Sequence, residues 1–192
     1  MLRNYAVVLV LTTVIANGPR LQAQITSLEL PLVRPMAIAY SPDGRQVAVA
    51  GFQMEQGKPA NGIVSLVDVA TGKQQFRLEL SAVMNGPKGG AVSSANSIRG
   101  LAFSPDGRAL AVASDQGLKL WDPATGKERS TVAGYEGNDD PRVEKFTSVA
   151  FSPDGNLLAA INNKRVQIWD AGTLKHVREF DIGGRDRLLF SP

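Results

Sequence analysis

One unit of sequence recurs three times along this chain and begins a fourth time. Its first half is an apolar stretch that ends in Ser-Pro-Asp-Gly, and it occupies residues 36–44, 99–107 and 147–155, with RLLFSP at 187–192. Its second half is an apolar stretch that ends in aspartate before a turn, and it occupies residues 63–73, 118–127 and 166–175. Recurrence at this spacing indicates one structural unit that is stacked several times.

The residues before each Ser-Pro alternate between large and small side chains. Leu101 and Phe103 are large, and Ala102 between them is small. A period of two predicts a β-strand. Proline presets the backbone for a tight turn, aspartate suits the next position, and glycine takes the left-handed conformation. We therefore assign structural turns to Asp43, Gly44, Asp106, Gly107, Asp154 and Gly155.

Each unit reads as four strands, which we call a, b, c and d. A second apolar run follows each Pro-Asp-Gly turn as a hairpin partner, and a more polar run follows each strand c, as expected of an outer edge. Such a sheet needs neighbours on both faces, and radial stacking provides them. The predicted fold is all-β: a β-propeller fragment, an open arc of three four-stranded antiparallel blades plus the first strand of a fourth. The blades are expected at 36–80, 98–133 and 147–182, with the fourth beginning at 187.

Two Trp-Asp pairs, Trp121-Asp122 and Trp169-Asp170, end strand c in the second and third units. With the three Ser-Pro-Asp-Gly turns in register, the chain resembles the WD40-repeat (WD-repeat) β-propeller family over about residues 36–192. The resemblance implies tryptophans packed between neighbouring sheets, with Asp68, Asp122 and Asp170 at the ends of strand c. The chain departs from the family pattern in two respects. No unit has a Gly-His pair before strand a, and the first unit has Val67-Asp68, which is nearer to the YVTN-type propellers.

The N-terminal segment reads as a targeting sequence. Residues 6–16 are a mostly apolar run of 11 residues, too short to cross a bilayer, which needs about 20. The run fits the apolar core of a secretory signal peptide, with cleavage after Ala23. Residues 1–23 are then the signal peptide, residues 24–35 an N-terminal strand or linker, and the mature chain is secreted or periplasmic. The alternatives are an uncleaved membrane anchor and a buried element of the domain.

The units differ in length only at one end of the predicted sheets. The distance between successive Ser-Pro-Asp-Gly serines falls from 63 residues to 48 and then to 39 for the last Ser-Pro. All the extra residues lie in b–c or d–a connections, at 52–61, 81–97 and 134–146, which share one end of a meander. Binding residues concentrate in such loops. The predicted partner-binding rim comprises Phe52, Met54, Tyr135, Glu136, Asp139, Asp140 and Arg142. Neutral drift in exposed loops is the alternative.

Composition argues against several kinds of site. The chain has no cysteine and one histidine, His176, so it lacks thiolate metal ligands and any pair of imidazoles. Its net charge is +3, or +1 without Arg3 and Arg20, which gives no electrostatic reason to expect nucleic acid or an anionic membrane as partner. The acidic residues at 136–144 match no calcium-loop spacing, and the basic residue Arg142 lies among them. We assign no catalytic, cofactor-binding or metal-ligating residue.

The predicted function is a protein–protein interaction scaffold with protein or peptide partners and no enzymatic activity. A propeller enzyme or cofactor binder, similar to a lactonase or a quinoprotein, is the alternative from another class. A third reading is a truncated fragment without an independent role. Because three blades leave two apolar flanks uncovered, self-association through the unclosed blade edges is also expected.

Overall fold

The computed structural model describes residues 7–16, 21–30, 34–53, 61–80, 97–115, 117–134, 145–162, 165–182, 188 and 190. These residues form strands joined by turns, with no helix among them. None of the described segments is therefore a helix that is long and apolar enough to cross a membrane.

Three four-stranded antiparallel sheets make up the repeats, and each is a meander. Blade one contains β3 (Arg34–Tyr40), β4 (Gln46–Gln53), β5 (Asn61–Asp68) and β6 (Gln74–Leu80). Blade two contains β7 (Ile98–Phe103), β8 (Leu110–Ser114), β9 (Gly117–Asp122) and β10 (Lys127–Gly134). Blade three contains β11 (Ser148–Phe151), β12 (Leu157–Ile161), β13 (Arg165–Asp170) and β14 (His176–Asp181). Each strand pairs with the next in the chain, so the predicted a–b–c–d order is confirmed.

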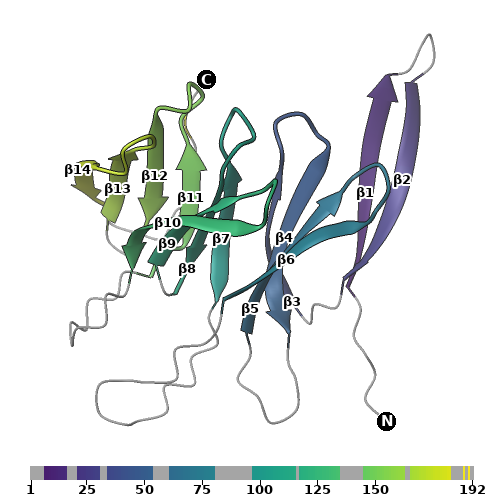
Figure 1. The fold of residues 1–192 in the computed structure, drawn as a ribbon, viewed down its shortest axis with the longest axis horizontal. Helices are drawn as coiled ribbons and strands as arrows, with labels where there is room; N and C mark the ends of the chain where they lie inside the picture. Colours follow the sequence, from purple (N-terminus) through teal and green to yellow (C-terminus); the bar gives the residue numbers. More distant parts are fainter. Residues whose placement is uncertain are drawn as a thin grey trace.

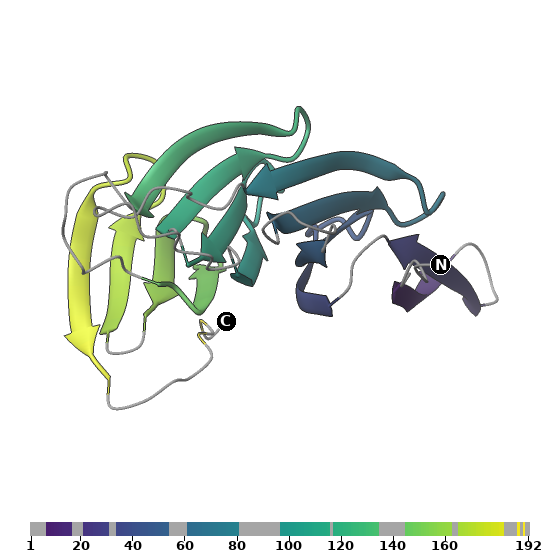
Figure 2. The same ribbon diagram turned by 90° about the horizontal axis from the view of Figure 1, so that it is seen from below.

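The three sheets stand side by side in the order of the sequence and fan out as an open arc (Figures 1 and 2). The first strands of successive blades face one another, since β3 contacts β7 and β7 contacts β11. This is the arrangement of propeller blades around an axis, with strand a innermost. The fold class that the sequence predicts is therefore confirmed.

The predicted fourth blade is represented by Leu188 and Phe190, which belong to no strand. The backbone N–H of Leu188 donates to Ser148 Oγ at 3.3 Å. Ser148 begins β11, so the chain returns beside the innermost strand of blade three.

The N-terminal segment forms a separate antiparallel hairpin of β1 (Val7–Ala16) and β2 (Leu21–Leu30). The hairpin lies at the N-terminal flank of the arc (Figure 1). The strand predicted within residues 24–35 thus starts earlier, at Leu21, and its backbone groups pair with β1 along its length. A hairpin in this segment does not test whether the segment is a signal peptide, because a signal peptide is removed from the mature chain. The targeting interpretation therefore stays a prediction.

Among the described residues, two apolar clusters of the core each lie between neighbouring blades. In the first, Leu66 and Leu78 of blade one pack with Leu101 and Phe103 of blade two. In the second, Leu118 and Leu120 of blade two pack with residues of blade three, including Leu158. The large residues of β7 therefore face the preceding blade, and Leu101 and Phe103 are each only 9% exposed.

The tryptophans of the two Trp-Asp pairs lie in these clusters. Trp121 is partly buried against the first cluster, and Trp169, 4% exposed, belongs to the second. The ring of Trp169 meets Phe146 edge to face at a centroid distance of 5.9 Å, and it meets His176 at 6.2 Å. Edge-to-face geometry at these distances is favourable for aromatic pairs. Among the described side chains, Trp121 Nε1 is a buried polar atom without a hydrogen-bond partner.

Candidate functional site

The blades have two unlike ends. The a–b and c–d turns lie at one end of each sheet, which we call the turn end. The b–c and d–a connections lie at the other end, which we call the rim. Candidate functional groups occur at both.

At the turn end, each Ser-Pro-Asp-Gly segment forms the same hydrogen-bonded turn. The backbone N–H of Gly44 donates to the carbonyl of Ser41 at 2.9 Å, and Gly44 has φ +69°. The Ser41 hydroxyl donates to Asp43 Oδ1 at 2.6 Å and accepts from the N–H of Gln46 at 2.8 Å. The same bonds recur at Ser104 and Asp106 in blade two and at Ser152 and Asp154 in blade three.

The aspartates of these turns are held as carboxylates. A hydrogen bond from Ser41 lowers the pKa of Asp43, and one from the Arg45 N–H lowers it further. The pKa of Asp106 and that of Asp154 are lowered in the same way, first by Ser104 and by Ser152 respectively. Hydrogen bonds to the charged form stabilise it. The geometry gives these residues the turn-forming role that the sequence indicates, together with Gly107 and Gly155 at φ +70° and +74°.

The aspartates that end strand c cap the second turn of each blade. Asp68 Oδ1 accepts from the Thr71 N–H and from Thr71 Oγ1, both at 2.7 Å, and Asp170 does the same with Thr173. These bonds, the threonine hydroxyl's first, lower the pKa of Asp68 and of Asp170. Asp122 accepts from the Ala124 N–H at 2.8 Å and pairs with Arg129 at 3.1 Å, and the Arg129 hydrogen bond is the main cause of its lowered pKa.

The predicted partner-binding rim is only partly described by the structure. Phe52 lies near the end of β4, paired with Arg34 on one side and Gly62 on the other, and its side chain is half-buried. The other predicted rim residues lie outside the described residues: Met54, Tyr135, Glu136, Asp139, Asp140 and Arg142.

One residue at the border of the rim is not available to a partner. Phe146 was expected among the extra residues 134–146, but it is completely buried in the second core cluster. Its N–H donates to the Ser114 carbonyl at 3.2 Å. Phe146 lies six residues before Ser152, and Ile98, which begins β7, lies six residues before Ser104. Both pack between blades, and their shared spacing from the serine is present in the sequence.

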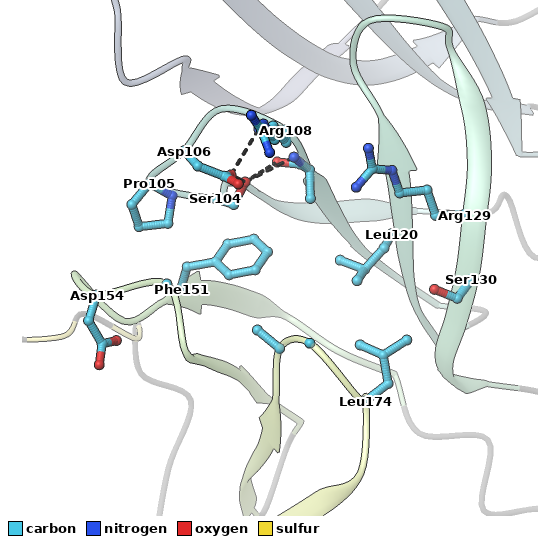
Figure 3. Close-up of a pocket in the computed structure, with 14 residues that line it drawn as sticks. Ser104, Pro105, Asp106, Arg108, Leu120, Arg129, Ser130, Phe151, Asp154 and Leu174 are labelled. Atoms are coloured by element: carbon cyan, nitrogen blue, oxygen red, sulfur yellow. Dashed lines mark hydrogen bonds between the residues drawn. The ribbon is translucent and has the colours of Figure 1, made fainter.

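The turn end carries a cleft that the sequence pattern does not predict. It lies between blades two and three and has a volume of about 580 Å³. Leu120, Phe151 and Leu174 form an apolar wall, and Arg108 and Arg129 lie at the blade-two side (Figure 3). No group of three or more metal-ligating side chains occurs in the described parts of the chain.

Comparisons with known proteins agree with this architecture. The family model described as WD domain, G-beta repeat matches residues 84–122 and 129–170. A solved structure of U3-55K is similar with a TM-score of 0.53 and 18% sequence identity, over 76% of this chain. That similarity is one of fold, and the chain spans 38% of the U3-55K chain. No curated protein matched. The chain therefore carries two stretches that match the WD40 repeat model, and its three meander blades in an arc have the β-propeller fold.

Proposed function

We propose that this chain is a scaffold whose rim binds protein or peptide partners. WD40 repeats in general indicate protein–protein interaction. The observation that carries the rim assignment is the contrast between the two ends of the blades. Each a–b turn is short and is closed by hydrogen bonds of its serine and aspartate and by one backbone hydrogen bond. In contrast, the b–c connection of blade one and two of the d–a connections contain extra residues. Rigid sheets that present variable loops are a common basis for recognition.

The test is capture of partners by the chain and by rim-deleted variants. Deleting residues 82–95 and 136–144 shortens two d–a connections while it keeps Ser97 and Phe146, whose backbones bond to Asp115 and Ser114. We expect these deletions to abolish capture of at least one partner. Lys73→Glu with Lys175→Glu, two exposed changes at the turn end, is the matched control. If the deleted variant keeps its circular dichroism spectrum and still captures every partner, the rim assignment is wrong.

We propose that the exposed apolar side chains of β3, the first strand of blade one, promote self-association. On β3, Ile38 and Tyr40 are each 47% exposed, whereas Leu101 and Phe103 at the corresponding positions of β7 are covered by blade one. Exposed apolar side chains in a sheet favour association. Sedimentation of residues 24–192 should show oligomers, and Ile38→Lys with Tyr40→Lys should reduce them. One compact monomer of the unmodified chain at high concentration would contradict this.

We propose secretion through the N-terminal segment, on the basis of its apolar run at residues 6–16. N-terminal sequencing of the protein from its native source should begin at Gln24. A mature chain that starts at Met1 would refute cleavage. We also expect no enzymatic activity, and a stoichiometric metal bound to the purified full-length protein would favour the alternative of a propeller enzyme or cofactor binder.

A further inference from the structure

Aspartate is followed directly by glycine at three places in this chain, and each of them is an a–b turn: Asp43-Gly44, Asp106-Gly107 and Asp154-Gly155. This dipeptide is prone to isomerisation in water, because glycine has no side chain to hinder attack by its own nitrogen on the aspartate side chain. The nitrogen loses its proton, bonds to aspartate Cγ and expels one carboxyl oxygen as water, which leaves a succinimide ring. Water then opens the ring. Addition at the former side-chain carbonyl restores aspartate, whereas addition at the main-chain carbonyl gives isoaspartate, whose main chain is one carbon longer.

The carboxyl group of each turn is held in the form that does not react. Ring closure needs a neutral carboxyl group, because a carboxylate does not release an oxygen as water. In blade two the Ser104 hydroxyl donates to Asp106 Oδ1, and the Arg108 N–H donates to the same oxygen at 3.0 Å (Figure 3). The Ser104 hydrogen bond is the main cause of the lowered pKa of Asp106. Both bonds also fix the orientation of the carboxylate.

The nitrogen that would attack is also held. The N–H of Gly107 donates to the Ser104 carbonyl at 2.8 Å, and the glycines of the other two turns make the same bond at 2.9 Å. Attack on Cγ requires this hydrogen bond to break and the peptide plane to turn. The serine therefore restrains both reacting groups, the carboxylate through its hydroxyl and the glycine nitrogen through its carbonyl.

The three turns differ in how closely their surroundings confine them. A Cβ added at Gly155 would lie 3.5 Å from Pro105 Cδ of the preceding blade, whereas one added at Gly44 would meet no described atom within 4 Å. Asp154 also accepts a further hydrogen bond, from Asn156 Nδ2 to Oδ2 at 2.7 Å. The turn of blade three is thus the most confined, and the turn of blade one is the most open.

We propose that each Ser-Pro-Asp-Gly turn protects its own Asp-Gly bond from isomerisation, and that the serine hydroxyl supplies this protection by holding the aspartate side chain. Burial does not account for it, because Asp106 is exposed to water while Ser104 is only 6% exposed. The protection preserves the blades, since isoaspartate would insert a carbon atom into the main chain between strands a and b. A turn that loses its hydroxyl becomes a site of spontaneous modification.

The test is prolonged incubation of the 192-residue chain at neutral pH, followed by digestion with trypsin. Trypsin places the three turns in separate peptides, because lysines and arginines lie between them. Electron-transfer fragmentation then measures isoaspartate at each position. The reference is the peptide Ac-Phe-Ser-Pro-Asp-Gly-Asn-NH₂, which has the sequence of residues 151–156. We expect isomerisation in the chain to be at least about tenfold slower than in the peptide. Equal rates would overturn the proposal.

The same measurement ranks the three turns. The rate should be highest at Asp43 and lowest at Asp154, in line with their confinement. The reverse order would refute the contribution of Pro105 and Asn156.

Two variants separate the hydroxyl from general stability. Ser104→Ala should raise the rate at Asp106 by about threefold or more, because one hydrogen bond no longer has to break. The rates at Asp43 and Asp154 in the same molecule are the controls and should not change. A rise by the same factor in all three turns would indicate unfolding and refute the role of the hydroxyl, as would an unchanged rate at Asp106. Asn156→Ala alters an exposed side chain and should raise the rate at Asp154 alone. An unchanged rate there would refute control by hydrogen bonds to the carboxylate, whether or not the serine variant folds.

Discussion

The ring of Phe76 in blade one covers Gly126 in blade two so closely that a Cβ on Gly126 would stand 2.8 Å from Phe76 Cδ1. Gly126→Ala should therefore destabilise the folded chain for two reasons. Alanine is strained in the left-handed backbone at φ 67°, and its Cβ displaces the Phe76 ring. We expect a loss of about 2–4 kcal/mol in the free energy of unfolding, measured with denaturant.

Gly44→Ala separates the two costs. Gly44 has φ 69°, but an added Cβ would meet no atom within 4 Å. This variant should lose only the backbone contribution, about 1–2 kcal/mol. Equal losses in the two variants would show that the Phe76 contact has no energetic weight.

Gly100 allows the inner strands of blades two and three to approach. An added Cβ would lie 3.1 Å from both Ser148 Cα and Val149 N, which are backbone atoms and cannot rotate away. Gly100→Ala should cost about 1–3 kcal/mol, read from the denaturation midpoint. Gly172→Ala is the control, since its Cβ would meet Asp170 Oδ1 at an ordinary 3.6 Å, and it should not destabilise. A neutral Gly100 variant would contradict the close packing of β7 on β11.

The buried hydroxyl of Ser152 serves as both donor and acceptor in its turn. It donates to Asp154 and accepts from the Leu157 N–H at 2.9 Å. Ser152→Ala should lower the thermal midpoint, with a loss of about 1–2 kcal/mol, because the Leu157 N–H loses its partner. Ser130→Ala, whose hydroxyl bonds to no described group, should change stability by less than about 0.5 kcal/mol. Similar losses in both would refute the role of the Ser152 hydroxyl.

Acid should destabilise the turn end. The pKa of each turn aspartate is lower in the folded chain than in the unfolded chain, where it is about 3.9. The stabilisation is therefore present above that value and is lost as the pH falls through the folded-state pKa. Urea midpoints should decrease as the pH falls from 5 to 3, and less steeply in Asp154→Asn. A midpoint that rises over this range would contradict the predicted direction.

The repeat predicts the strands and turns because both depend on local sequence. Alternation predicted the buried face of β7, and the serine, proline and glycine spacing predicted the a–b turns. Exposure of Ile38 and Tyr40 does not follow from alternation, since the same pattern buries Leu101 and Phe103. Burial there depends on whether another sheet stands beside the strand.

The cleft could not be predicted in the same way. Ser130 and Leu174 have no unusual feature within their own strand and turn, and they line one cleft only because blades two and three lie side by side. Aligning the three units shows Phe76, Ser130 and Arg178 at one position and Gly72, Gly126 and Leu174 at another. That alignment becomes informative once the contact between a strand d and the next c–d turn is known. Leu174 also departs from the expected glycine at a left-handed position.

The arrangement of sheets along the arc makes the effect of a substitution depend on its blade. Each sheet packs only on its immediate neighbours, so stability is close to a sum of terms for single blades and for the junctions between them. Among the described blades, the middle one takes part in both apolar clusters. A defect in β7 or β8 therefore weakens two junctions at once and divides the arc, whereas a defect in β14 frays one end and leaves the opposite junction intact.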